Sequence, residues 1–316
     1  ANIIFLLFIS LFILNNAAGY SESFTTYLNT KKSLYVWGYP NADNFLSFVK
    51  DHKFEKVFLY VGCIEWDYDK LSVGKLHSAG NLDSKELIQK LIDMNVEVDL
   101  AIYLNDSPNN FENYELVENV AKALAELQKR LKFHALHFDV EPSSVGNFEK
   151  LVKMYEMSRK YLPVSAILKP GWLSKNMADL TGYFSEEYYK KYGKWETFVD
   201  VLMEVTDYSE LMAYNAKYET VDKFLSKFEA IRQRHPDHVA KPVLELDKAA
   251  GNDSLYGAFV EDSAKFFKYL AQVSKNFDGV TIHQYQIWNY NLYCVNPKKD
   301  TTYYFGEPKK DTTYYF

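Results

Sequence analysis

The sequence has 316 residues, 47% of them hydrophobic and 25% charged, a composition that can bury a core. Its formal net charge is −6, and the lysines are scattered along the chain. Nucleic acid is therefore excluded as an expected partner, because proteins that bind it carry a concentrated basic surface.

The first 19 residues have the features of a secretory signal peptide. An apolar run at residues 3–14 is followed by the small residues Ala17, Ala18 and Gly19. The run is shorter than the roughly 20 apolar residues that span a bilayer, and the small residues suit a cleavage site. We expect residues 1–19 to be removed, and the protein to be secreted or held in the secretory-pathway lumen. No later segment is apolar enough for membrane insertion.

Secretion would permit two covalent modifications. "NDS" at Asn105 and at Asn252 fits the N-glycosylation pattern, which predicts a glycoprotein. The two cysteines, Cys63 and Cys294, either form a disulfide or remain free thiols, and both alternatives stay open.

From residue 33 to residue 288, short apolar runs alternate with longer segments of helical period. The runs predict eight strands, which begin at Ser33, Lys56, Val96, Phe133, Val164, Ser209, Lys241 and Gly279. The intervening segments predict helices over residues 41–53, 83–95, 112–132, 147–162, 220–235 and 260–277, with Asn147 as the expected N-cap of the fourth.

Eight such strand–helix units predict a single (β/α)8 TIM barrel over residues 20–296. The alternative is an open doubly wound sheet, although no glycine-rich phosphate loop follows the first strand. Residues 173–208 exceed the length of one helix, so we expect a longer excursion between strands five and six. "PKKDTTYYF" at 297–305 recurs at 308–316, and we expect this duplicated Tyr-rich tail to be disordered.

The fourth predicted strand, "FHALHFDVEP", ends in two acids. Alternation along a strand places His137, Asp139 and Glu141 on one face, and the apolar residues between them on the other. In a barrel the polar set would point inward and Glu141 would stand at the mouth, where barrel enzymes carry catalytic groups. Crowding two carboxyls raises the pKa of one, so that it can serve as a general acid. The alternative is a structural polar network that fills the barrel centre.

These residues resemble the fourth-strand motif of glycoside hydrolase family 18, the chitinase and endo-N-acetylglucosaminidase family. That motif, Asp-Gly-x-Asp-x-Asp-x-Glu, falls on "HALHFDVE", where Asp139 and Glu141 match and His134, Ala135 and His137 depart from it. "MAYN", from Met212 to Asn215, is similar to the family's sixth-strand motif, and Trp288 is similar to its Trp after strand eight.

The resemblance implies a secreted glycoside hydrolase that acts on a polysaccharide or glycan without a cofactor. Glu141 would protonate the glycosidic oxygen, while Asp139 and Tyr214 would assist a substrate acetamido group that attacks the anomeric carbon. Met212 and Asn215 would contact the substrate, and His137 and His283 would support the site. Because His137 replaces an acid of the motif, the resemblance leaves the level of activity open.

A second interpretation keeps the hydrolysis and changes the nucleophile. "PVLELDK" places Glu245 at the end of the seventh strand, where a two-carboxylate retaining glycosidase would use it together with Glu141.

Carbohydrate is the expected partner because aromatic residues stand at several strand ends, where they would stack on sugar rings. They are Trp37, Tyr39, Tyr103, Trp172, Tyr285 and Trp288.

Two further interpretations stay open. A phosphodiesterase-type barrel would use His137, His283, Asp139 and Glu141 as metal ligands, although we expect no metal. Alternatively, the departures from the family motif and the Tyr-rich tail are typical of a catalytically inactive carbohydrate-binding or matrix protein.

Overall fold

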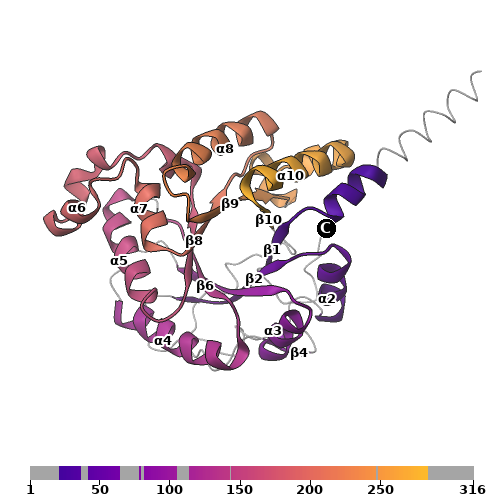
Figure 1. Ribbon diagram of the computed structural model, residues 1–316, viewed down its shortest axis with the longest axis horizontal. Coiled ribbons are helices and arrows are strands. Elements are labelled where there is room, and N and C mark those ends of the chain that lie inside the picture. Colours follow the sequence, from indigo (N-terminus) through magenta and orange to yellow (C-terminus); the bar gives the residue numbers. More distant parts are fainter. Residues whose placement is uncertain are drawn as a thin grey trace, which may run out of the picture.

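The computed structural model describes residues 21–36, 42–64, 78–79, 82–104, 114–142, 144–246 and 248–283. Within them, eight parallel strands follow one another around a closed barrel, and the last pairs with the first (Figure 1). They are β1 (Lys32–Val36), β2 (Lys56–Ile64), β5 (Glu97–Leu104), β6 (Ala135–Val140), β7 (Val164–Leu168), β8 (Tyr208–Met212), β9 (Val239–Glu245) and β10 (Val280–His283). The predicted (β/α)8 barrel is confirmed, because in an open sheet β1 and β10 would not pair with each other.

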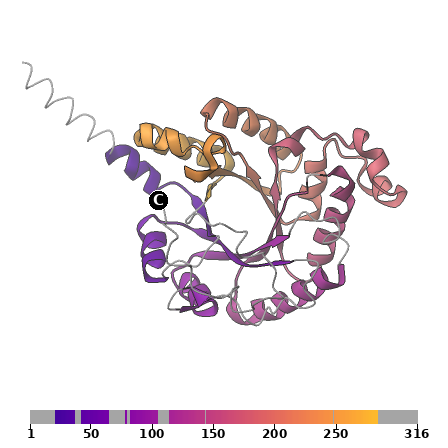
Figure 2. The same cartoon turned by 180° about the vertical axis from the view of Figure 1, so that it is seen from behind.

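Helices surround the barrel in the same order, as both views show (Figures 1 and 2). They are α2 (Ala42–Asp51), α3 (Ser84–Asp93), α4 (Tyr114–Leu131), α5 (Phe148–Ser158), α6 (Glu186–Tyr192), α7 (Phe198–Val205), α8 (Tyr218–Arg232), α9 (Tyr256–Glu261) and α10 (Ser263–Phe277). Two very short strands, β3 (Ser78–Ala79) and β4 (Leu82–Asp83), pair outside the barrel. Asn147 is the N-cap residue of α5, as predicted, but its side chain makes no capping hydrogen bond.

The excursion between the fifth and sixth barrel strands is confirmed. It holds two 3-10 segments, Pro170–Ser174 and Met177–Tyr183, followed by α6 and α7. A capping box begins α7, since Thr197 and Asp200 each bind the other's backbone N–H. The start of α7 follows from the sequence, because Thr197 directly precedes the apolar run "FVDVLMEV".

The residues of each strand divide between the inside and the outside of the barrel. Leu136, Phe138 and Val140 of β6 are fully buried in the shell between strands and helices. A smaller apolar group fills the barrel interior, and it consists of Tyr35, Phe58, Ala101, Ala135, Ile167, Tyr208, Met212 and Val243. The alternation predicted for strands therefore decides which side chains face the barrel axis.

One helical segment, residues 21–28, was not predicted and lies beside α10 (Figures 1 and 2). Tyr27 stacks on Phe267 of α10 with ring centroids 4.8 Å apart. The hydroxyl of Tyr27 also hydrogen-bonds His52, just after α2, at 2.9 Å. The segment thus bridges the first and last helices where the barrel closes.

Several predictions lie outside the described residues. They are the signal peptide, the Tyr-rich tail, Asn105 and Cys294, together with Trp37, Tyr39, Tyr285 and Trp288. The backbones of Cys63 and Tyr103 belong to β2 and β5, but their side chains are not described. In the described part of the chain, no helix combines the length and the apolarity needed to span a bilayer.

Candidate functional site at the mouth of the barrel

Along the inward face of β6, the side chains become more exposed toward the carboxyl end. Ala135 and His137 are fully buried, whereas Asp139 and Glu141 are only partly buried. The two acids therefore stand where the barrel opens, at the end where barrel enzymes carry their active sites.

His137 lies below the acids and is held from two sides. Its Nε2 is hydrogen-bonded to the Tyr35 hydroxyl at 2.7 Å, and its Nδ1 to Ser165 Oγ at 2.7 Å. Burial, followed by the charge of Lys56, lowers the pKa of His137 to about 3. The ring is therefore neutral at physiological pH, with one nitrogen donating and the other accepting.

The carboxyls of Asp139 and Glu141 are hydrogen-bonded to each other. Burial, the nearby charge of Glu141 and this hydrogen bond raise the pKa of Asp139 well above its usual range, while the charge of Lys169 opposes the rise. Asp139 therefore keeps its proton to a higher pH than an ordinary aspartate does. The arrangement is that of an acid and a base in direct contact.

Lys169 lies on the other side of Glu141. Its Nζ is 3.4 Å from Glu141 Oε2, and both side chains are about one-third exposed. Lys169 directly follows β7 and continues the inward-facing positions of Ser165 and Ile167, so alternation alone places it at the mouth. Sequence reasoning missed it because an isolated lysine next to Pro170 looks like an ordinary loop cation.

Tyr214, just after β8, faces the same region. Burial raises the pKa of Tyr214, and the charges of Glu245, Asp139 and Glu141 raise it further. Its ring centroid is 5.5 Å from that of His283. A phenol that keeps its proton in this setting is a hydrogen-bond donor to whatever enters the mouth.

Glu245 and His283 form a third pair, at the ends of β9 and β10. His283 Nδ1 donates to Glu245 Oε2 at 2.5 Å, and both side chains are largely buried. Glu245 thus lies close enough to act electrostatically on Tyr214, but one of its oxygens is already bound.

The predicted substrate-contacting residues lie in different places. Met212 is buried in the barrel interior below Tyr214, and the Asn215 side chain accepts a hydrogen bond from the backbone N–H of Lys217 at 3.0 Å. The prediction for Trp172 was wrong. Its ring is buried in the outer shell, 5.7 Å from the rings of both Phe148 and Phe198, because the 3-10 turn after β7 directs it under α5 and α7.

A metal centre built on His137 is not supported, because both of its nitrogens already have partners. In the part of the chain that the structure describes, Glu97, Asp99 and His134 offer ligand atoms within 4.8 Å of one another. This cluster lies at the opposite end of the barrel, and Lys56 Nζ is 2.7 Å from Glu97 and 3.0 Å from Asp99. A lysine ammonium therefore supplies the positive charge that a metal would supply.

Comparisons with known proteins reveal similarity at the level of fold. No protein-family model matches the sequence, and no curated protein matches it. A chitinase from Bacteroides thetaiotaomicron is 12% identical with a TM-score of 0.52, over 83% of this chain and 92% of that one. The spore cortex-lytic enzyme SleL of Bacillus cereus is 10% identical with a TM-score of 0.54, over 81% of this chain and 71% of that one.

A chitinase from Chromobacterium violaceum is 10% identical with a TM-score of 0.50, over 81% of this chain and 94% of that one. At these identities the similarity establishes the barrel architecture that carries Asp139 and Glu141. It does not by itself assign chemistry.

Proposed function

We propose that this chain is a glycoside hydrolase that acts on a polysaccharide or glycan. The observation that carries the proposal is the interacting carboxyl pair of Asp139 and Glu141 at the mouth. Tyr214 lies near enough for the charges of both acids to raise its pKa. The similarity in fold to chitinases and to a cortex-lytic enzyme supports a carbohydrate substrate.

The three side chains divide the reaction between them. Glu141 gives a proton to the glycosidic oxygen as the bond from that oxygen to the anomeric carbon breaks. The carbonyl oxygen of the substrate's own acetamido group forms the new bond to that carbon, so no enzyme nucleophile is required. Asp139 and the Tyr214 hydroxyl orient the acetamido group, and water later releases the product and returns the proton to Glu141.

The proton for the first step has a nearby source. In the free protein the raised pKa of Asp139 places the shared proton on that residue, and the hydrogen bond provides a direct path from Asp139 to Glu141. His137 lies below Asp139, and both of its ring nitrogens are hydrogen-bonded to other residues. At this position of β6, Asp139 therefore meets a neutral imidazole in place of a second carboxylate. The pair therefore works as an isolated two-carboxyl unit in this proposal.

A two-carboxylate retaining mechanism is the second candidate, because Glu245 also acts on Tyr214 and faces the same mouth. In that case Glu245 would attack the anomeric carbon and form a covalent glycosyl intermediate. Its bond with His283 would have to loosen, since an oxygen held at 2.5 Å by a donor is a weaker nucleophile.

Hydrolysis of a chromogenic panel tests the proposal. N-acetylglucosaminides and plain glucosides would be compared for the wild type, Glu141→Gln, Glu245→Gln and the control Glu187→Gln, whose side chain is exposed on α6. We expect activity on N-acetylglucosaminides that falls at least a hundredfold in Glu141→Gln and is unchanged in the control.

The remaining outcomes separate the alternatives. Cleavage of plain glucosides, abolished equally by Glu245→Gln, would favour the two-carboxylate mechanism. Hydrolysis that Glu141→Gln leaves intact would rule out the proposed acid. Binding of the oligosaccharides without any hydrolysis would identify a carbohydrate-binding protein.

We also propose that the chain is secreted and glycosylated. Asn252, in one of the two predicted sequons, has an exposed side chain within the 3-10 segment Lys248–Asp253. Expression in a eukaryotic secretory host should give a protein whose gel mobility increases after removal of N-linked glycans. The Asn252→Gln variant should lose that shift in part or in full, and an unchanged shift would contradict glycosylation at this position.

A further inference from the structure

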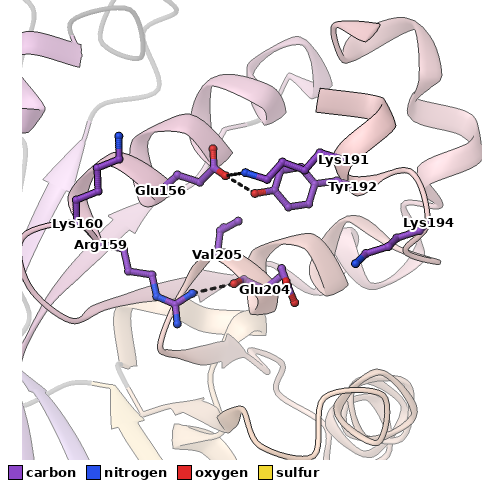
Figure 3. A pocket seen from close by; sticks show the side chains of 8 residues that line it. All are labelled: Glu156, Arg159, Lys160, Lys191, Tyr192, Lys194, Glu204 and Val205. Carbon is purple, nitrogen blue, oxygen red and sulfur yellow. Dashed lines mark hydrogen bonds and ion pairs between the residues drawn. The ribbon is translucent and has the colours of Figure 1, made fainter. Parts of the chain in front are cut away.

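A pocket of about 720 Å³ lies outside the barrel, between α5, α6 and α7 (Figure 3). It is lined by Glu156, Arg159, Lys160, Lys191, Tyr192, Lys194, Glu204 and Val205. The lining residues from α5 and its end precede β7, and those from α7 precede β8. The pocket therefore lies toward the amino ends of these strands, whereas Glu141 lies at the carboxyl end of β6.

Three of the charged side chains that line the pocket, Glu156, Lys191 and Arg159, are held by hydrogen bonds. Glu156 accepts hydrogen bonds from Lys191, Tyr192 and Tyr188. Arg159 donates to Asp207 at 3.1 Å and to the backbone carbonyl of Glu204 at 2.9 Å. Glu156 and Arg159 therefore hold the helices around the pocket together, and each has a partner of opposite charge.

Two lysines form no ion pair among the described residues, although the charge of Lys160 acts on Glu118 from farther away. No carboxylate of the described residues lies within 4.0 Å of Lys160 or Lys194, and they stand on opposite sides of the pocket (Figure 3). Lys194 lies 5.1 Å from the Trp195 ring, which orients its chain but leaves the ammonium charge uncompensated. Tyr192 and Val205, each about 3% exposed, form an apolar base.

We propose that this pocket binds an acidic oligosaccharide, meaning one that carries carboxylate or sulfate groups. Two separated ammonium groups suit two anionic groups on one ligand, because lysine acts as a point charge without a fixed geometry. The exposed carboxylate of Glu204 would repel a simple polyanion, but it can accept hydrogen bonds from sugar hydroxyls. A volume of about 720 Å³ is also within the roughly 300–1,000 Å³ of pockets that hold ligands larger than a lone sulfate.

The two lysines make the pocket locally positive, whereas the whole chain has a net charge of −6. Charges beyond about 10 Å are screened at moderate ionic strength, so the pocket lysines and not the net charge decide what binds here. The proposal goes beyond the proposed hydrolysis, because none of these residues belongs to the mouth of the barrel.

Titration calorimetry on the full chain tests the proposal. The probes are a sulfated and a uronic-acid oligosaccharide, a neutral oligosaccharide of equal length, and inorganic sulfate alone. We expect at least one acidic probe to bind at least tenfold more tightly than the neutral probe and inorganic sulfate. Because salt screens charges, the affinity of that probe should fall severalfold as the salt concentration rises from about 0.05 to about 0.5 M. The sulfated and uronic probes distinguish which anionic group is preferred.

The variant Lys160→Gln/Lys194→Gln should bind the acidic probe at least tenfold more weakly. A matched control, Lys223→Gln/Lys268→Gln, removes two exposed lysines from α8 and α10 and should bind as the wild type does. Circular dichroism verifies that both variants are folded.

Equal binding of the neutral probe, equal binding by inorganic sulfate, or full binding by the Lys160→Gln/Lys194→Gln variant would overturn the proposal. Glu141→Gln should retain the binding, so that loss of hydrolysis and loss of this interaction are separate observations.

Discussion

At the scale of single residues, one lysine acts on the carboxyl pair at the mouth. Lys169 Nζ lies 3.4 Å from Glu141 Oε2, and the charge of Lys169 lowers the pKa of Asp139 against the effects that raise it. Removing the lysine should therefore raise the pKa of Asp139 further.

The matched variants Lys169→Met and Lys169→Arg test this role. We expect the alkaline limb of the pH dependence of kcat/KM to shift upward by about one pH unit or less in Lys169→Met, because the contact is partly exposed and screened. Lys169→Arg keeps the charge and should keep the wild-type profile. Identical profiles for all three proteins would show that Lys169 only packs against the mouth.

The predictable part of the site follows from strand alternation. Asp139 and Glu141 could be placed inside the barrel because every second residue of a strand shares a face. The partners of His137 could not be predicted, because Tyr35 and Ser165 come from strands that only barrel closure and register bring next to it. Likewise, the turn that buries Trp172 depends on packing against α5 and α7 and not on the local sequence.

At the scale of elements, Asp200 joins the start of α7 to the end of α8. It is fully buried, binds Thr197 of its own capping box, and receives two hydrogen bonds from Arg234, at 2.9 and 2.8 Å. His235 Nε2 lies 2.9 Å from the same carboxylate. The excursion is thereby fixed to the end of α8. Its helices α6 and α7 contribute to the pocket that contains Lys160 and Lys194.

Replacing Asp200 should expose how much of the stability depends on this connection. We expect Asp200→Asn to lower the free energy of unfolding by about 2–3 kcal/mol, because the buried carboxylate that accepts hydrogen bonds from Arg234 and Thr197 becomes a neutral amide with one acceptor oxygen. Urea unfolding at pH 7 measures it, with the exposed Asp237→Asn as control. A loss no larger than in the control would contradict the structural role.

The same bonds have a defined pH dependence. Although burial acts in the opposite direction, the bonds from His235, Arg234 and Thr197 lower the pKa of Asp200. A carboxyl whose pKa is lowered on folding stabilises the protein above its unfolded pKa, and this contribution is lost as the pH falls below about 4. The difference in unfolding free energy between wild type and Asp200→Asn should therefore shrink on acidification.

The positions of most strands and helices could be predicted from the sequence, whereas the contacts that fix them could not. The eight apolar runs and the periodic segments correspond to the barrel strands and the main helices, because burial imposes those periods. The helix at residues 21–28 was missed since it lies next to the expected signal peptide and is fixed by contacts to Phe267 and His52, far away in sequence.

At the scale of the whole molecule, the barrel interior holds ionisable groups as well as the apolar residues described above. One end holds the ion pairs of Lys56 with Glu97 and Asp99, the other holds the acids of the mouth, and Glu210 lies between them with 1% exposure. Thr281 Oγ1 donates to Glu210 Oε2 at 2.6 Å. Such a fold buries ionisable groups that an apolar barrel would avoid, so its stability should depend on pH.

Glu210 makes that dependence measurable. Burial raises the pKa of Glu210 to about 7, although Lys241 and the Thr281 bond act in the opposite direction. Between its ordinary pKa of 4.5 and 7, the folded state holds a proton that the unfolded state releases, so stability falls as the pH rises through this window. The fall amounts to roughly 3 kcal/mol, at about 1.4 kcal/mol per pH unit.

Glu210→Gln stays neutral and can still accept the hydrogen bond from Thr281, so this variant should lack that part of the fall. Urea unfolding of the wild type, Glu210→Gln and the exposed control Glu204→Gln would be measured at pH 5, 6, 7 and 8. Relative to the wild type, Glu210→Gln should gain roughly 3 kcal/mol between pH 5 and pH 8, whereas the control should follow the wild type. Asp139 titrates in the same direction in all three proteins, so its contribution cancels in the comparison. Parallel curves for Glu210→Gln and wild type would mean that Glu210 is ionised inside the barrel, with the charge of Lys241 outweighing the cost of burial.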